Sequence, residues 1–141
     1  YQQKNAVFIR LVAFRKRLVI DKEGKVYYNE GKENVISIGS LNLTDCIVLH
    51  NHPKVNGMLS FGENDFYIMR EYQLALYRLV NEEYDYSAEI IKSISGLSYN
   101  QVYQKGLDIA YETMEIDLQH CCMEYLKREG YINYVRKRID R

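Results

Sequence analysis

The sequence contains no tryptophan, only one proline and only three cysteines among its 141 residues. An odd number of cysteines, two of them adjacent, does not make a disulfide framework and favours a reducing compartment such as the cytoplasm. Acidic and basic residues number 19 each, so the net charge of zero predicts no strong attraction to nucleic acid or to a membrane surface. No apolar run approaches the length that a bilayer span needs, so we expect no membrane partner.

Length and hydrophobic content predict a single domain. The 141 residues, 47% of them hydrophobic, suffice for one core. The chain begins with tyrosine rather than methionine, so we expect residues 1–141 to be one domain excised from a longer chain. Tyrosine is abundant, with 14 residues, and we expect some of them in the core and others on an amphipathic contact surface.

The most informative stretch, residues 47–66, holds two of the three histidines and the single proline. The apolar run Cys46–Leu49 predicts a buried strand, and His50 and His52 follow it two residues apart. If the strand geometry persists, both imidazoles leave the same face and can converge on one cation. Pro53 ends the strand because it has no N–H for the sheet. A His-x-His pair alone is a weak signal, since most such pairs bind no metal.

The sequence after the proline strengthens the metal hypothesis. A helix is predicted to begin near Ser60–Asn64, and Asp65 opens its apolar stripe, which places a carboxylate on the inward face of the first turn. Two histidines and one aspartate form a three-ligand set that leaves one coordination position free for water, as in catalytic zinc sites. We therefore predict a Zn²⁺ site made of His50, His52 and Asp65.

The segments His50–Pro53 and Phe61–Phe66 resemble the signature of JAB/JAMM (MPN-type) metallopeptidases, in which His-x-His-Pro is followed by Ser-x-x-Asp. They are most similar to the form found in RadC-like proteins and in JAB-like domains of phage head-morphogenesis and polymorphic-toxin proteins. The resemblance covers about Val19 to Tyr134, and only the His-x-His-Pro motif is specific. It implies a JAB-like α+β fold, zinc held by the two histidines and Asp65, amide hydrolysis by a metal-bound water, and a cytoplasmic or virion-associated location.

The serine of the family signature, which helps to stabilise the oxyanion, has two candidate counterparts. If Asp65 is the ligand, the serine position falls on Gly62, which has no hydroxyl. If Ser60 is the family serine, the ligand position falls on Glu63 instead. We favour Asp65 because two phenylalanines then bracket the motif as in the phage form. Ser60 and Glu63 would serve equally well as a helix capping box.

The glutamate that acts as general acid and base in the resembling domains comes shortly before an Ile-Asp-x-x-Gly hairpin, which here is Val19–Gly24. The residues before this hairpin, Arg15–Arg17, are all basic. Glu23, Glu30 and Glu33 remain as candidates, with Glu23 taken as the catalytic one, but their turn-like surroundings predict that they face solvent. Without a base, peptidase activity should be slow, since such help contributes about a hundredfold or more.

The remaining patterns predict an α+β fold, with a mixed β-sheet that begins as a β-meander. A helix follows the His-x-His-Pro strand, and a long C-terminal helix begins at a capping box formed by Ser98 and Gln101. The elements that we expect are strands at Arg17–Ile20, Lys25–Tyr28, Val35–Ile38, Cys46–Leu49 and Tyr84–Ile91, and helices from about Ser60 to Val80 and from Ser98 to Lys127.

The apolar stripe of the C-terminal helix is predicted to include Leu107 and Met114 and to face the core. His120, Cys121 and Cys122 form a second group of metal-binding residue types on this helix. Adjacent residues on a helix point about 100° apart, so we predict helix packing rather than a second metal site.

Three functions compete. The first is a zinc-dependent JAB-like peptidase or isopeptidase with a protein or peptide substrate, which we place ahead. The second is a degenerate JAB-like module that interacts with a phage or toxin partner protein. The third, an HNH nuclease, is suggested only by the letters His50-Asn51-His52, and we reject it because HNH nucleases spread those residues over a ββα-metal unit. A buried carboxylate close to the pair of His50 and His52 would favour the peptidase over the module, and zinc binding without such a group would favour the module.

Overall fold

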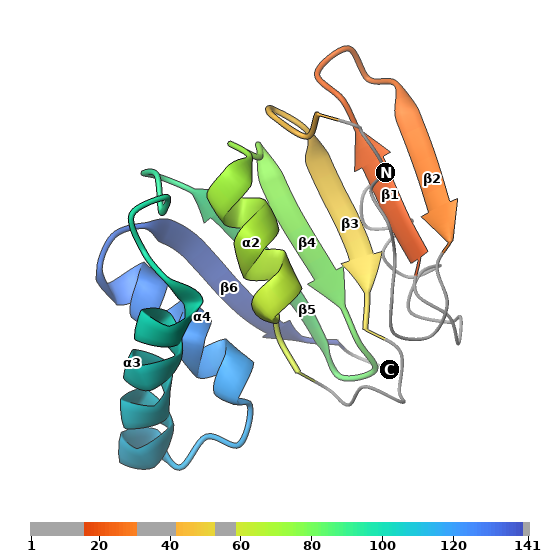
Figure 1. Cartoon of the computed structure of the whole chain (residues 1–141). Coiled ribbons are helices and arrows are strands. Elements are labelled where there is room, and N and C mark those ends of the chain that lie inside the picture. Colours follow the sequence, from red (N-terminus) through yellow and green to blue (C-terminus); the bar gives the residue numbers. More distant parts are fainter. Residues whose placement is uncertain (1–15, 31–41, 53–58, 140–141) are drawn as a thin grey trace.

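The computed structural model describes residues 16–30, 42–52 and 59–139 (Figure 1). For Lys16, Asn29 and Glu30 the description covers the backbone alone. The predicted strand Val35–Ile38 and the candidate base Glu33 lie outside the described residues. No helix in the described ranges is long and apolar enough to cross a membrane.

Six strands in the described ranges form one mixed sheet in the order β2-β1-β3-β4-β5-β6. Neighbouring strands are antiparallel except for β3 and β4, which are parallel because the connection between them carries a helix, α2, from one end of the sheet to the other. The strands are β1 (Lys16–Ile20), β2 (Val26–Glu30), β3 (Ile47–Asn51), β4 (Leu76–Val80), β5 (Tyr84–Ile90) and β6 (Ile132–Arg138). The α+β class, the mixed sheet, the first hairpin and the strand near Tyr84 are thus as predicted.

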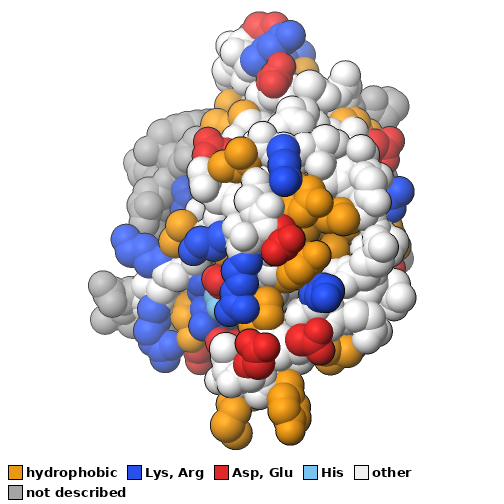
Figure 2. Space-filling model, turned by 90° about the vertical axis from the view of Figure 1, so that its left-hand side faces the viewer, with side chains coloured by type: hydrophobic (Ala, Val, Ile, Leu, Met, Phe, Trp, Pro, Cys, Tyr) orange, Lys and Arg blue, Asp and Glu red, His pale blue; other side chains and the backbone are white. Residues whose placement is uncertain are grey.

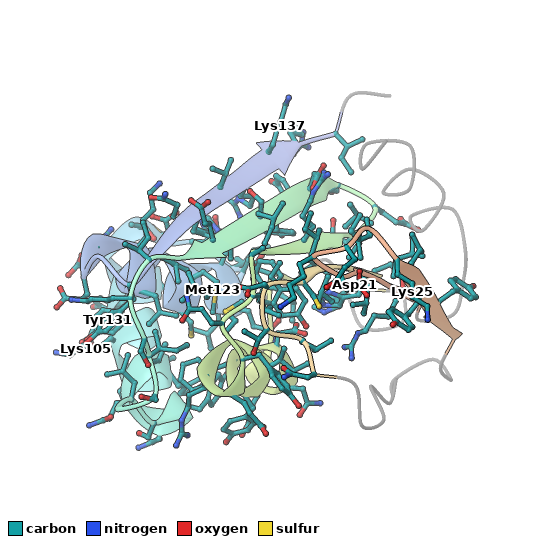
Figure 3. All side chains as sticks on the ribbon, turned by 90° about the horizontal axis from the view of Figure 1, so that it is seen from above. Asp21, Lys25, Lys105, Met123, Tyr131 and Lys137 are labelled. Atoms are coloured by element: carbon teal, nitrogen blue, oxygen red, sulfur yellow. The ribbon has the colours of Figure 1, made fainter. Side chains whose placement is uncertain are left out.

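The three described helices lie on one face of the sheet (Figures 1 and 3). They are α2 (Glu63–Glu71), α3 (Tyr99–Thr113) and α4 (Leu118–Arg128). The main core fills the space between the helices and the sheet, where Phe66 of α2, Met123 of α4 and Tyr77 of β4 are all fully buried. A smaller cluster of Ile20, Leu49 and Val80 belongs to the opposite face. The sheet therefore presents the β3 residues Val48 and His50 to the helical layer.

The helix after the motif is shorter than predicted. It ends at Glu71, and Tyr72 already has an extended backbone, with φ −120° and ψ 141°. Leu76 and Leu79, which fall inside the predicted helix, instead belong to β4 and pair with β3. The spacing of three between these leucines fits a helix as well as it fits part of a strand. The segment is a strand because it pairs with the buried strand β3.

The long C-terminal helix is in fact two helices. Met114 adopts a left-handed backbone, with φ 58°, which ends α3, and Asp117 then caps α4 through a 2.9 Å hydrogen bond from the N–H of His120. Two residues of the predicted stripe do not face the core: Leu107 is 38% exposed and Met114 86% exposed. Hydrophobic side chains protrude at the lower end of the face in Figure 2, and the turn between α3 and α4 carries such exposed apolar residues.

The buried residues of α3 each come one position earlier in the sequence than a residue of the predicted stripe. They are Val102, Gly106 and Ile109, and the face that they form packs on α4. Gly106 allows the closest approach, because a Cβ at this position would lie 2.6 Å from the sulfur of Cys122. Cys122 and its neighbour Cys121 are buried by this packing, which agrees with the packing role predicted for the pair.

Candidate metal centre

Three of the predicted ligand residues meet at the junction of β3 and α2. His50 is in β3, His52 directly follows this strand, and Asp65 is the third residue of α2. One nitrogen or oxygen atom from each lies within 4.8 Å of the others, a grouping that can hold a metal ion. The three residues are 1%, 7% and 2% exposed, respectively. It is the only group of three or more such residues found in the described ranges.

The distances between the donor atoms suit a small tetrahedral ion. The Nε2 atom of His50 lies 3.1 Å from Oδ1 of Asp65, and Nε2 of His52 lies 3.5 Å from Oδ2. Zinc–nitrogen and zinc–oxygen bonds near 2 Å place neighbouring tetrahedral ligands about 3.3 Å apart. The donor set of two imidazoles and one carboxylate is also one that zinc accepts. The residues present therefore fit a Zn²⁺ ion.

His52 is held in the tautomer that a metal ligand needs. Its Nδ1 atom lies 2.9 Å from the carbonyl oxygen of Leu59. A carbonyl only accepts hydrogen bonds, so Nδ1 carries the proton and the Nε2 lone pair faces Asp65. Metal-binding histidines usually donate their second N–H in this way, which fixes the ring orientation.

His50 is buried as a neutral imidazole. Within the described part of the chain, neither of its ring nitrogens makes a hydrogen bond. The 3.1 Å contact from Nε2 to Asp65 is close, but it lacks the direction of a hydrogen bond. Burial lowers the pKa of His50 to about 4, although the nearby Asp65 carboxylate acts in the opposite direction. An uncharged ring with a free nitrogen is the form in which histidine binds a metal.

The Asp65 carboxylate is fixed by neighbours other than the histidines. The hydroxyl of Tyr77 donates a 2.6 Å hydrogen bond to Oδ1, and the backbone N–H of Gly62 donates a 3.0 Å hydrogen bond to Oδ2. Burial alone would raise the pKa of Asp65, but the two adjacent histidines hold it well below its usual range. The group therefore stays ionised and oriented, as a ligand must.

A buried arginine adjoins this group. Arg17 in β1 pairs directly with His50 in the antiparallel β1–β3 ladder, so both side chains leave the same face of the sheet. Arg17 is 4% exposed, and among the described residues its Nε and Nη1 atoms have no hydrogen-bond partner. The basic run before the first hairpin is visible in the sequence, but the pairing of Arg17 with His50 depends on the register of two distant strands.

The other candidate site residues lie elsewhere. Glu23 is exposed in the turn after β1, beyond Ile20, which pairs with Ile47 at the end of β3 away from His50. Glu63 is exposed and accepts a 2.9 Å hydrogen bond from Tyr67. The backbone of Glu30 ends β2, but its side chain is outside the description.

Ser60 is fully buried, but it does not cap α2. Its hydroxyl lies 2.8 Å from the hydroxyl of Tyr134, while Gly62 occupies the N-cap position and Asp65, not Glu63, closes the turn from the N3 position. The alternative role considered for Ser60 and Glu63, a helix capping box, is therefore not found. The helix begins at Glu63, within the predicted range, and its N-cap is Gly62, whose N–H donates to the Asp65 carboxylate.

A second polar network, which the sequence patterns did not predict, surrounds Ser60. Buried Asp117 accepts hydrogen bonds from the Ser60 N–H at 3.1 and 3.2 Å and from the Tyr86 hydroxyl at 2.9 Å. The Tyr134 hydroxyl also lies 2.7 Å from Nδ1 of His120. Tyr86 and Tyr134 lie on the paired strands β5 and β6, His120 lies on α4, and Asp117 is the N-cap of α4, so the network joins elements that are distant in the sequence. The network holds Ser60, in the segment that leads into α2, against Asp117 and β6.

No protein family, curated protein or solved structure matches this chain in comparisons of its sequence and fold. The function of the site has to be inferred from the chemistry of its own residues.

Proposed function

We propose that this chain is a zinc-dependent hydrolase of the JAB/JAMM type that cleaves an amide bond in a peptide or an isopeptide linkage. The observation that supports the proposal is the convergence of His50, His52 and Asp65 in a buried group with donor separations that suit Zn²⁺. The order of these residues, strand end followed by helix start, is also that of the resembling signature.

Zinc in this group would supply Lewis-acid polarisation of a scissile carbonyl and activation of water as a nucleophile. The protein's own residues prepare the position. The Leu59 carbonyl fixes the tautomer of His52, and the Tyr77 hydroxyl and Gly62 N–H fix the Asp65 carboxylate. The low exposure of all three candidate ligands excludes bulk water and strengthens electrostatic interactions at the site.

A non-catalytic zinc-binding module, which assembles with a phage or toxin partner, is the second candidate. The position of Glu23 favours it, because this residue is exposed at the far end of β1. Within the described ranges, Asp65 is also the only carboxylate that belongs to the three-residue group. The family's glutamate comes from the segment before the first hairpin, which here is basic. The residue of this segment that pairs with His50 is Arg17, which cannot act as a general base.

Elemental analysis of the purified protein tests the metal centre. We expect about one zinc per chain in the wild type, and a loss of zinc in His52→Ala. His120→Ala is the matched control, since His120 is the one histidine outside the group, and it should retain the metal. Absence of zinc from a correctly folded, zinc-incubated wild-type protein would contradict the proposal.

Hydrolysis is tested with the zinc-loaded protein and mixtures of short peptides and isopeptide-linked peptides, with products identified by mass spectrometry. Cleavage by the wild type and none by His52→Ala would support the hydrolase. Stoichiometric zinc without cleavage of any substrate class would favour the non-catalytic module.

A further inference from the structure

Arg17 is a buried cation, and among the described residues most of its hydrogen-bonding capacity is unused. Its side chain belongs to a residue that is 4% exposed, and its Nε and Nη1 atoms have no partner among the described residues. These two nitrogens carry three of the five N–H donors of a guanidinium group. Arginine stays charged in proteins, so this side chain cannot avoid the cost of burial by losing a proton.

The strand register places Arg17 beside the candidate metal centre. Arg17 is the direct partner of His50, and the neighbouring pair Leu18 and Leu49 points to the opposite face, where Leu49 belongs to the smaller cluster. Side chains of directly opposed residues in antiparallel strands start about 5 Å apart at Cβ. The long arginine side chain therefore lies on the same face as the two histidines.

Asp65, the carboxylate of the candidate metal centre, forms no ion pair with Arg17. Asp65 already accepts hydrogen bonds from Tyr77 and Gly62 and adjoins both histidines. No ion pair joins Arg17 to any carboxylate of the described residues, whereas Arg78, another arginine of the sheet, is paired with Asp85. A buried arginine whose Nε and Nη1 have no partner among the described residues can receive an anion next to the metal-binding group.

We propose that Arg17 forms an anion subsite beside the metal centre and binds the carboxylate group that hydrolysis of an amide releases. The inference rests on the proposed metal-dependent hydrolysis, because that reaction supplies a carboxylate next to the metal. The planar guanidinium matches the two oxygens of a carboxylate, and the low exposure of the site strengthens the pairing. Arg17 thus pairs with the acyl product, once water has replaced the amine at the neutral amide carbonyl and left a carboxylate.

The test compares wild type, Arg17→Met and Arg78→Met after replacement of zinc by cobalt(II), whose visible absorption reports changes at the metal centre. We expect sodium acetate to change the wild-type spectrum saturably. The apparent affinity should fall about tenfold or more in Arg17→Met. It should remain unchanged in Arg78→Met, whose arginine faces the opposite side of the sheet and is paired with Asp85. Equal acetate affinity in wild type and Arg17→Met would overturn the proposal.

Inorganic phosphate provides the second arm of this titration. Weaker binding of phosphate than of acetate supports a carboxylate subsite. Tighter, Arg17-dependent binding of phosphate would overturn the assignment to a carboxylate and identify a phosphate subsite instead.

Thermal unfolding of the metal-free and anion-free variants separates ligand binding from a structural role. Removal of an unpaired buried charge should raise the melting temperature in Arg17→Met, whereas removal of a paired arginine in Arg78→Met should lower it. A lower melting temperature in Arg17→Met would show that the arginine is a structural residue and overturn the proposal.

Failure of the metal centre has its own signature. If the wild type binds no cobalt, the proposed function fails, and Arg17 is then tested by acetate-dependent stabilisation of the metal-free protein. Stabilisation of the wild type but not of Arg17→Met would support the anion subsite without the metal, and no stabilisation of either would overturn it.

Discussion

The hydroxyl of Tyr77 donates a 2.6 Å hydrogen bond to Oδ1 of Asp65, the same oxygen that lies 3.1 Å from Nε2 of His50. Tyr77 lies in β4, next to the strand that carries His50, and its ring also packs against the His50 ring at a centroid distance of 4.9 Å. One side chain thus positions both a carboxylate and an imidazole. The candidate metal centre is therefore an extension of the core and not a surface feature.

Replacement of Tyr77 by phenylalanine should weaken zinc binding while the fold is retained. The ring would still fill the core, but Oδ1 of Asp65 would lose the donor that orients it. Loss of such a supporting hydrogen bond typically lowers metal affinity about 10- to 100-fold. Competition with a chromogenic zinc chelator measures the change directly.

Tyr86→Phe is the matched control for this substitution. The Tyr86 hydroxyl is equally buried, but it donates to Asp117, outside the three-residue group. This variant should lose stability of about 1 to 3 kcal/mol and keep its zinc affinity. Similar zinc affinities in both tyrosine variants would show that the Tyr77 hydroxyl does not act on the metal centre.

Ser60→Ala should lower stability without a change in zinc affinity. The Ser60 hydroxyl contacts the Tyr134 hydroxyl at 2.8 Å in the second polar network, so its loss leaves a buried partner less satisfied. We expect the free energy of unfolding to fall by about 1 to 2 kcal/mol in urea titrations. The exposed Ser93→Ala is the control and should change stability by less than about 0.5 kcal/mol. A loss of hydrolysis at unchanged stability would instead favour the predicted oxyanion role of Ser60.

Local sequence patterns were sufficient for the parts of the site that lie close together in the chain. The buried strand that carries His50 and the inward position of Asp65 follow from apolar patterns over short windows. The grouping of His50, His52 and Asp65 agrees with that prediction, while their role as metal ligands remains to be tested.

Residues contributed by neighbouring strands could not be predicted in this way. Arg17 and Tyr77 reach the site through the pairing of β1 and β4 with β3, and register between strands is not encoded in a single stretch. The break at Met114 was missed for a related reason. Its left-handed backbone is unusual for a residue without a polar side chain, and the helical spacing runs through it unchanged.

The metal-free protein should lose stability as the pH falls from about 6.5 to about 4. The folded-state pKa of His50 is lowered to about 4 by burial, so the unfolded chain binds more protons in this window. The loss should approach roughly 3 kcal/mol for His50. Asp65, whose pKa is held well below its usual range, adds a further loss below about pH 4.

Urea titrations of the metal-free protein over this pH range measure the effect. Burial also lowers the pKa of His120, which therefore contributes with the same sign. His50→Gln should flatten most of the profile, and His120→Gln should remove a smaller part, because His120 is less buried than His50. An unchanged profile in His50→Gln would show that His50 is not held as a neutral ring.

Gly106→Ala should destabilise the packing of α3 on α4, although alanine is the better helix former. The added Cβ would lie 2.6 Å from the Cys122 sulfur and 3.1 and 3.2 Å from the Cys122 backbone nitrogen and Cα. The sulfur can move in part, but the backbone of α4 cannot move without disturbing Cys122 and Met123 in the core. Overpacking of this kind costs about 1 to 3 kcal/mol, which exceeds the gain in helix propensity of about 1 kcal/mol. Gly96→Ala is the control, since its Cβ would meet nothing within 4 Å, and its melting temperature should stay close to that of the wild type.

The same substitution should also disturb the segment before α2. Asp117 caps α4 and accepts a hydrogen bond from the Ser60 N–H, so a shift of α4 in Gly106→Ala would reach residues 59–62, where amide hydrogen exchange would detect it. Faster exchange there, together with a lower melting temperature, would show that the two helices and the metal centre form one cooperative unit.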